Sequence, residues 1–154
     1  MPQLTAYLSF DGTCAEAFRF YEEALGGKVI ALMKNGETPA AEHVPPGNAD
    51  RIMHACLDLG NGTLLMGGDA LVGGGDDCAG GKFEGMKGFM VAVTYDDTDQ
   101  ARRVFERLSD GGSVQMPWSP TFWAEGFDMV TDKYGTPWGV NGKQLMGPNA
   151  NGGN

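Results

Sequence analysis

The amino-acid sequence predicts an α+β protein made of two β-α-β-β-β modules. The main observation is an internal repeat: the segment that starts at residue 10 recurs 85 residues later without a gap, so that Thr13 corresponds to Thr98. An aromatic residue, an acid, a threonine, a phenylalanine, a glycine pair and a valine fall in register. Each copy also has the pattern of a strand, an amphipathic helix and further strands. Six matches over about 20 residues predict a duplicated module.

The first module is expected to begin with a strand over residues 4–10 and a helix that starts after Thr13. Thr13 and Glu16 have the spacing of a capping box, in which the two side chains satisfy free amide groups at the helix start. Gly26 and Gly27 should end the helix, because glycine accepts the left-handed conformation of a helix C-terminus. The residues expected on its buried face are Ala17, Phe20, Tyr21, Ala24 and Leu25. Three further strands are expected over 28–33, 52–59 and 63–66.

The second module should repeat this order. Asp97 and Gln100 offer a comparable helix start, and Gly111 and Gly112 a comparable end. The residues expected on the buried face of the second helix are Ala101, Val104, Phe105 and Leu108. Strands are expected over 114–118, 128–131 and 137–141.

The chain length of 154 residues fits one domain, which we expect over residues 1–146. Module one should cover about 3–68 and module two about 88–142. Residues 67–88 include 9 glycines among 22 positions, which predicts a flexible connector. Residues 147–154 are rich in glycine and asparagine and are expected to form a disordered tail.

The composition excludes several classes of partner. Lysine and arginine number 11 against 20 aspartate and glutamate, so the formal net charge is −9, and neither nucleic acid nor an anionic membrane is an expected partner. No apolar run approaches the roughly 20 residues of a membrane span, and no secretory signal is recognisable. The three cysteines have unrelated spacings, as expected for reduced thiols in the cytoplasm.

Five segments add a family resemblance: residues 7–10, 52–55, 65–69, 120–124 and 132–138. Together with the FYEEALGG run that ends the first helix, they resemble the vicinal oxygen chelate superfamily. This superfamily includes glyoxalase I, bleomycin-resistance proteins and extradiol dioxygenases, and the chain looks most like its PhnB-like branch. The resemblance implies two modules that form an open, curled mixed sheet around a cavity. It also implies a homodimer.

Enzymes of this superfamily usually hold a divalent metal with four His, Glu or Gln side chains. Matching the strands and helices to that pattern gives Ala6, His54 and, in the second module, about Phe89 and Gly139. His54 alone among these could bind a metal, and one histidine cannot fix a divalent ion. We therefore expect no metal and no cofactor.

Four residues are candidates for ligand binding. His54 lies on an apolar strand, where it is either a core histidine or a polar contact and proton acceptor in the cavity. Phe122 and Trp123 could form an aromatic wall of a pocket, or equally a core plug or dimer contact. Met66 could line the pocket, although a core position is the simpler explanation.

These expectations favour metal-independent binding of a small, partly apolar molecule, as in resistance proteins that sequester a drug. Whether the chain catalyses a reaction stays open. The alternative is a lyase, isomerase or dioxygenase-like enzyme with an atypical metal site. A third alternative is a structural or interaction protein without a ligand.

Overall fold

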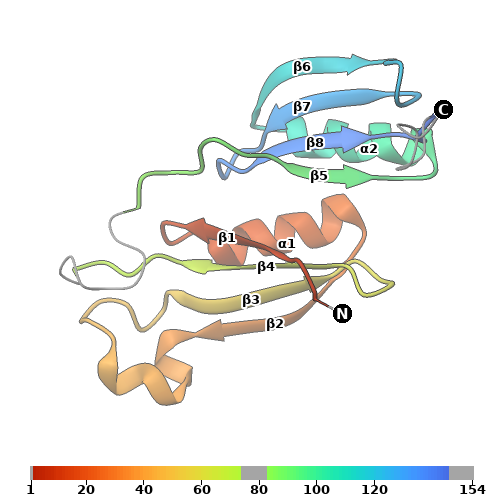
Figure 1. Cartoon of the computed structure of the whole chain (residues 1–154). Helices are drawn as coiled ribbons and strands as arrows, with labels where there is room; N and C mark the ends of the chain where they lie inside the picture. The colour runs from red at the N-terminus through yellow and green to blue at the C-terminus, as the bar shows by residue number, and fades with distance from the viewer. Residues whose placement is uncertain (1, 74–82, 146–154) are drawn as a thin grey trace. The chain divides into compact units, whose positions relative to one another are not determined.

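The structure is a computed structural model that describes residues 2–73 and 83–145 (Figure 1). The chain divides into two compact units, Met1–Gly85 and Met86–Asn154. Each unit is a β-α-β-β-β module with its own four-stranded mixed sheet, which confirms the predicted α+β class and the two modules. The predicted tail, 147–154, and Cys78 lie outside the described residues. Within the described part, no helix is long and apolar enough to cross a membrane.

The first unit has the sheet order β1-β4-β3-β2, in which β1 is parallel to β4 and the other pairs are antiparallel. Two short 3-10 helices, η1 and η2, lie in the loop before β3. The elements are β1 (Ala6–Phe10), α1 (Cys14–Leu25), β2 (Lys28–Lys34), η1 (Asn35–Glu37), η2 (Pro39–His43), β3 (Ile52–Asp58) and β4 (Leu64–Asp69).

The second unit repeats this topology with the order β5-β8-β7-β6, and β5 is parallel to β8 (Figure 1). Its elements are β5 (Val91–Thr94), α2 (Thr98–Ser109), β6 (Ser113–Ser119), β7 (Phe127–Thr131) and β8 (Pro137–Asn141). The same strand order in both units confirms the duplication that the sequence repeat predicts.

Each helix covers one face of the sheet in its own unit. In the first unit the ring of Phe10 packs edge-on against Phe18 of α1, with centroids 6.2 Å apart. Phe18 is fully buried, whereas Phe20, predicted for the buried face, is only half-buried. In α2, Phe105 is likewise half-buried and stacks on Trp118 of β6. The predicted buried faces are otherwise correct. The opposite face of each sheet, which we call the open face, carries no helix from the described residues of its own unit.

The predicted capping box at Thr13 is wrong. The Thr13 side chain makes no capping hydrogen bond, and Asp69 at the end of β4 takes its place. One Asp69 carboxylate oxygen accepts hydrogen bonds from the N–H groups of Gly12 (2.9 Å) and Cys14 (3.0 Å), and the other accepts from Ile52 (2.8 Å). Asp69 therefore ties the start of α1 to β3. In the second unit the predicted cap is correct, because Asp97 accepts from the N–H groups of Asp99 and Gln100.

Asp69→Ala should destabilise the protein by about 2–3 kcal/mol, because it leaves three amide donors without their acceptor. Thr13→Ala should change the free energy of unfolding by less than about 0.5 kcal/mol, since the lost hydroxyl caps nothing. Urea unfolding of the two variants measures both values. A larger loss for Thr13→Ala than for Asp69→Ala would contradict this assignment of the cap.

The predicted connector begins too early. Gly67 and Gly68 are buried inside β4, which extends to Asp69, three residues beyond the predicted strand. A Cβ atom at Gly67 would lie 2.9 Å from the ring of Phe18 and 2.8 Å from the carbonyl oxygen of Leu8. Gly67 thus lets the α1 aromatic residue approach the sheet closely, which is a packing role and not flexibility.

Candidate functional site

The open face of the first sheet brings together two of the predicted site residues. Side chains alternate between the faces of a strand, so register shows which residues share a face. Met66 of β4 pairs with Tyr7 of β1 and with Cys56 of β3, and His54 lies two residues from Cys56 on the same strand. His54, Met66 and Tyr7 therefore lie on the open face, and Met33, which pairs with His54, joins them from β2.

Tyr7 is the polar partner of His54. Its hydroxyl donates a hydrogen bond to the carbonyl oxygen of Met53 (3.2 Å) and lies 3.4 Å from Nδ1 of His54. The two rings are stacked, with centroids 5.8 Å apart and an angle of 26° between their planes. Burial, with a smaller contribution from Cys14, raises the pKa of the Tyr7 phenol above its ordinary value. Tyr7 is thus a neutral phenol at physiological pH.

Gly68 makes room for this arrangement. A Cβ atom at position 68 would lie 2.9 Å from the carbonyl oxygen of Met53 and 3.1 Å from the hydroxyl of Tyr7. Both contacts are closer than ordinary packing allows, so any side chain here would disturb the hydrogen bond between them. The roles of Tyr7 and Gly68 were not predicted from the sequence. Side chains alternate between the two faces of a strand, and Leu8 and Phe10 are apolar core candidates. This pattern could have placed Tyr7 on the open face.

The open face of the second sheet holds the aromatic candidates. The indole Nε1–H of Trp123 donates a hydrogen bond to Oδ1 of Asn141 (3.1 Å). Its ring packs edge-on against Phe122 (centroids 4.9 Å apart) and Phe127 of β7 (5.4 Å apart). Phe122 itself is 77% exposed. The structure thus groups His54 with Met66 in the first unit and Phe122 with Trp123 in the second.

Register also corrects how positions in the two modules correspond. Gly139 lies in β8 and pairs with Ala92 and Met129, so its counterpart in the first unit is Met66, not His54. His54 corresponds to Phe127 of β7 and Ala6 to Val91 of β5, so the placement at Phe89 was two residues too early.

The residues present do not fit the metal site that is usual in the superfamily that the sequence resembles. The corrected positions are Ala6 and His54 in the first module and Val91 and Phe127 in the second. Of these four side chains, His54 alone has an atom that could bind a divalent ion. Among the described residues, no group of three or more His, Cys, Asp and Glu side chains could hold a metal ion.

Cys14, at the start of α1, is not an activated thiol. It is fully buried, and burial together with the nearby Asp69 carboxylate raises its pKa to about 12. A nucleophilic cysteine needs the opposite shift, toward thiolate at neutral pH.

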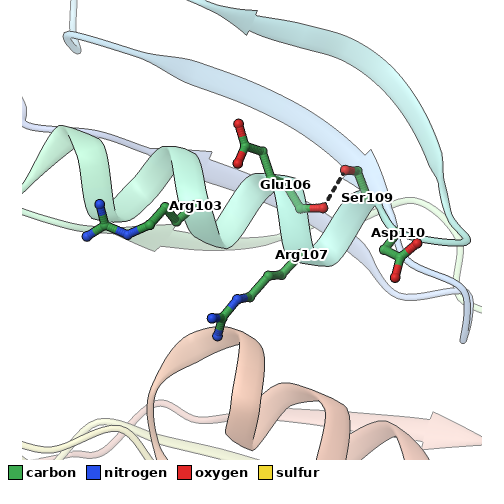
Figure 2. Close-up of a pocket in the computed structure, with 5 residues that line it drawn as sticks. All are labelled: Arg103, Glu106, Arg107, Ser109 and Asp110. Atoms are coloured by element: carbon green, nitrogen blue, oxygen red, sulfur yellow. Dashed lines mark hydrogen bonds between the residues drawn. The ribbon is translucent and has the colours of Figure 1, made fainter.

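One surface hollow lies along the C-terminal half of α2 (Figure 2). Its volume is about 590 Å³, and its lining comes from Arg103, Glu106, Arg107, Ser109 and Asp110. Ser109 donates its hydroxyl proton to the backbone oxygen of Glu106 (2.8 Å). The lining has charges of both signs and no aromatic ring, and none of the predicted site residues belongs to it. The site residues predicted from the sequence lie instead on the open faces of the two sheets, with His54 and Met66 on the first and Phe122 and Trp123 on the second.

Comparisons with known proteins agree with this fold. The sequence model of the Glyoxalase/Bleomycin resistance protein/Dioxygenase superfamily matches residues 3–140. Protein YjdN of Escherichia coli is 32% identical over 146 residues, which cover 90% of this chain and 93% of that protein.

Two solved structures are similar. Protein PA1353 of Pseudomonas aeruginosa is 38% identical, has a TM-score of 0.81, and the match covers 93% of this chain and 98% of that one. A PhnB protein of Bacillus cereus shares the fold, with 24% identity, a TM-score of 0.70, and coverage of 92% and 99%. The family match, over nearly the full chain, confirms the resemblance in the sequence. The chain belongs to the glyoxalase/bleomycin resistance protein/dioxygenase superfamily.

Proposed function

We propose that the protein binds a small, partly apolar molecule without a metal ion, and that it sequesters this molecule. The observation that carries the proposal is the composition of the open faces, where large apolar side chains stay exposed beside a few polar groups. Met33 is 40% exposed, Met129 is 36% exposed and Phe122 is 77% exposed. Mostly apolar surface with a small number of placed polar groups is typical of small-molecule sites.

Each open face offers its own contacts to such a molecule. The first offers the flexible thioethers of Met33 and Met66, which adapt to an irregular apolar shape, and the imidazole of His54. The second offers the ring of Trp123, whose single N–H already donates to Asn141. Trp123 therefore offers an oriented apolar surface to a molecule on the second open face, whereas His54 offers a hydrogen-bonding group to a molecule on the first.

Trp123→Ala should weaken binding of Nile red, a neutral apolar dye, by about tenfold, because it removes a large oriented aromatic ring from the site. A fluorescence titration measures the affinity. Trp118→Phe is the matched control, since Trp118 stacks on Phe105 on the helix side of the sheet. Equal affinities for the two variants would count against an aromatic wall at Trp123.

The same titration repeated with EDTA tests metal independence. We expect the affinity to be unchanged. Loss of dye binding on chelation, together with a stoichiometric metal that disappears in His54→Ala, would instead support an enzyme with an atypical metal site.

A further inference from the structure

We propose that the neutral His54 side chain carries its proton on Nδ1, so that Nε2 accepts a hydrogen bond from a hydroxyl or N–H group of the bound molecule. The inference rests on the proposed function and names the class of ligand for the open face of the first sheet: a neutral hydrogen-bond donor attached to an apolar ring or chain.

The first step follows from the single proton of the Tyr7 hydroxyl. The hydroxyl has two short contacts, and both can be hydrogen bonds at the same time only if its proton goes to the carbonyl oxygen of Met53, which lies 3.2 Å away and can only accept. The hydroxyl oxygen has no second proton for Nδ1 of His54, 3.4 Å away. A hydrogen bond between these two atoms therefore requires the imidazole to donate. In neutral imidazole one ring nitrogen donates and the other accepts, so a proton on Nδ1 leaves the Nε2 lone pair available.

The second step concerns what holds Tyr7 in this place. The raised pKa keeps the phenol neutral, so its proton stays available for Met53. Gly68 leaves the space that the hydroxyl occupies, because a Cβ there would contact both the Tyr7 hydroxyl and the Met53 oxygen. Residues from β1, β3 and β4 thus fix one orientation of the hydroxyl, and through it one tautomer of His54.

The third step gives the ligand class. An acceptor at Nε2 pairs with O–H and N–H groups and offers nothing to a carbonyl or carboxylate oxygen. The net charge of −9 also opposes anionic ligands. Met33, which pairs with His54, and Met66, which pairs with Cys56, lie on the same face, and their thioethers suit the apolar remainder of the molecule.

Nitrogen-15 NMR of the histidine rings tests the tautomer directly. The chain has two histidines, and the exposed His43 provides an internal reference. At about pH 9, where imidazole side chains are neutral, His54 should show a protonated Nδ1 and an unprotonated Nε2. Tyr7→Phe and Gly68→Ala should both shift His54 toward the tautomer mixture of His43, and Ser9→Ala, on the same strand and face, should not. A protonated Nε2 in the unmodified protein, or a spectrum equal to that of His43, would overturn the proposal.

A matched pair of probes tests the ligand class. Phenol carries a hydroxyl donor, whereas anisole has the same ring without it. We expect phenol to perturb the His54 resonances with at least threefold higher affinity than anisole, and Tyr7→Phe to remove this preference. Equal affinities would overturn the inference and leave the proposed function intact. Failure of both probes to perturb the open face would count against the proposed function itself.

Discussion

Replacing Asp128 with asparagine should abolish a large pH dependence of stability and raise stability above neutral pH. Asp128 lies in β7, pairs with Val140 and is fully buried. Among the residues that the structure describes, no hydrogen-bond partner is present for either of its carboxylate oxygens. Burial raises the pKa of this carboxyl to about 7, although an interaction with the backbone of Val140 opposes part of the rise. An ionised carboxylate in this position is unfavourable because it has lost its water, and the interaction with the backbone of Val140 offsets only part of that loss.

The direction of the effect follows from proton binding. The unfolded chain releases the proton near the ordinary value of 3.8, whereas the native state keeps it up to about 7. Between these values the native state binds more protons, so stability falls as the pH rises from about 4 to about 7. Above the native pKa the penalty is constant, at about 4 kcal/mol for a shift of roughly three pKa units.

Urea unfolding at about pH 4 and about pH 8 measures this contribution. The difference between Asp128→Asn and the unmodified protein should be small at the lower pH and a few kcal/mol in favour of the variant at the higher pH. Asp50→Asn is the control, because the Asp50 side chain is 99% exposed and should change stability little at either pH. The same pH dependence in Asp128→Asn as in the unmodified protein would contradict the prediction.

Replacing Asp132 with alanine should have the largest destabilising effect in the second unit, about 3–5 kcal/mol. Asp132 is 3% exposed and follows β7. One carboxylate oxygen accepts from the N–H groups of Tyr134 (2.8 Å) and Thr136 (3.2 Å), and the other accepts from Nε1 of Trp138 (2.7 Å). Thr136 and Trp138 are themselves buried, so water cannot replace the lost acceptor.

Thermal and urea unfolding of Asp132→Ala, with the exposed Asp96→Ala as control, measures the loss. A double-mutant cycle with Trp138→Phe separates the contribution of the indole hydrogen bond. We expect the two changes to be strongly non-additive, since either one breaks the same bond. Additive effects would show that Asp132 stabilises the turn alone and not the Trp138 position.

The sequence predicted the modules well because the signals that define them are local. Helix amphipathicity, glycine at helix ends and the repeat at an offset of 85 residues all depend on neighbours in the chain. Gly26, with a φ of 80°, ends α1 in the left-handed conformation that the pattern predicts. The positions of β2 and β8 follow from the same patterns within one residue.

The errors arise where a residue distant in sequence replaces a local partner. Thr13 is followed by a suitable glutamate, but the donors at the helix start bind Asp69, which is 55 residues away from Cys14. Gly67 and Gly68 have the composition of a linker, and only the packing of Phe18 and Tyr7 against them shows that they belong to a strand. His54 could be identified as a candidate from its residue type, whereas its partner Tyr7 required the pairing of β1 with β4.

The parallel pairing of β1 with β4 and of β5 with β8 has a consequence for synthesis on the ribosome. In each unit the first strand to emerge pairs with the last, so the four-stranded sheet cannot be completed until the whole unit has been translated. The N-terminal unit can complete its sheet once β4, which ends at Asp69, has left the exit tunnel. The ribosome is then still synthesising the second unit. Until then the apolar side of the first helix has no complete sheet to cover it, so the nascent chain exposes apolar surface that favours aggregation.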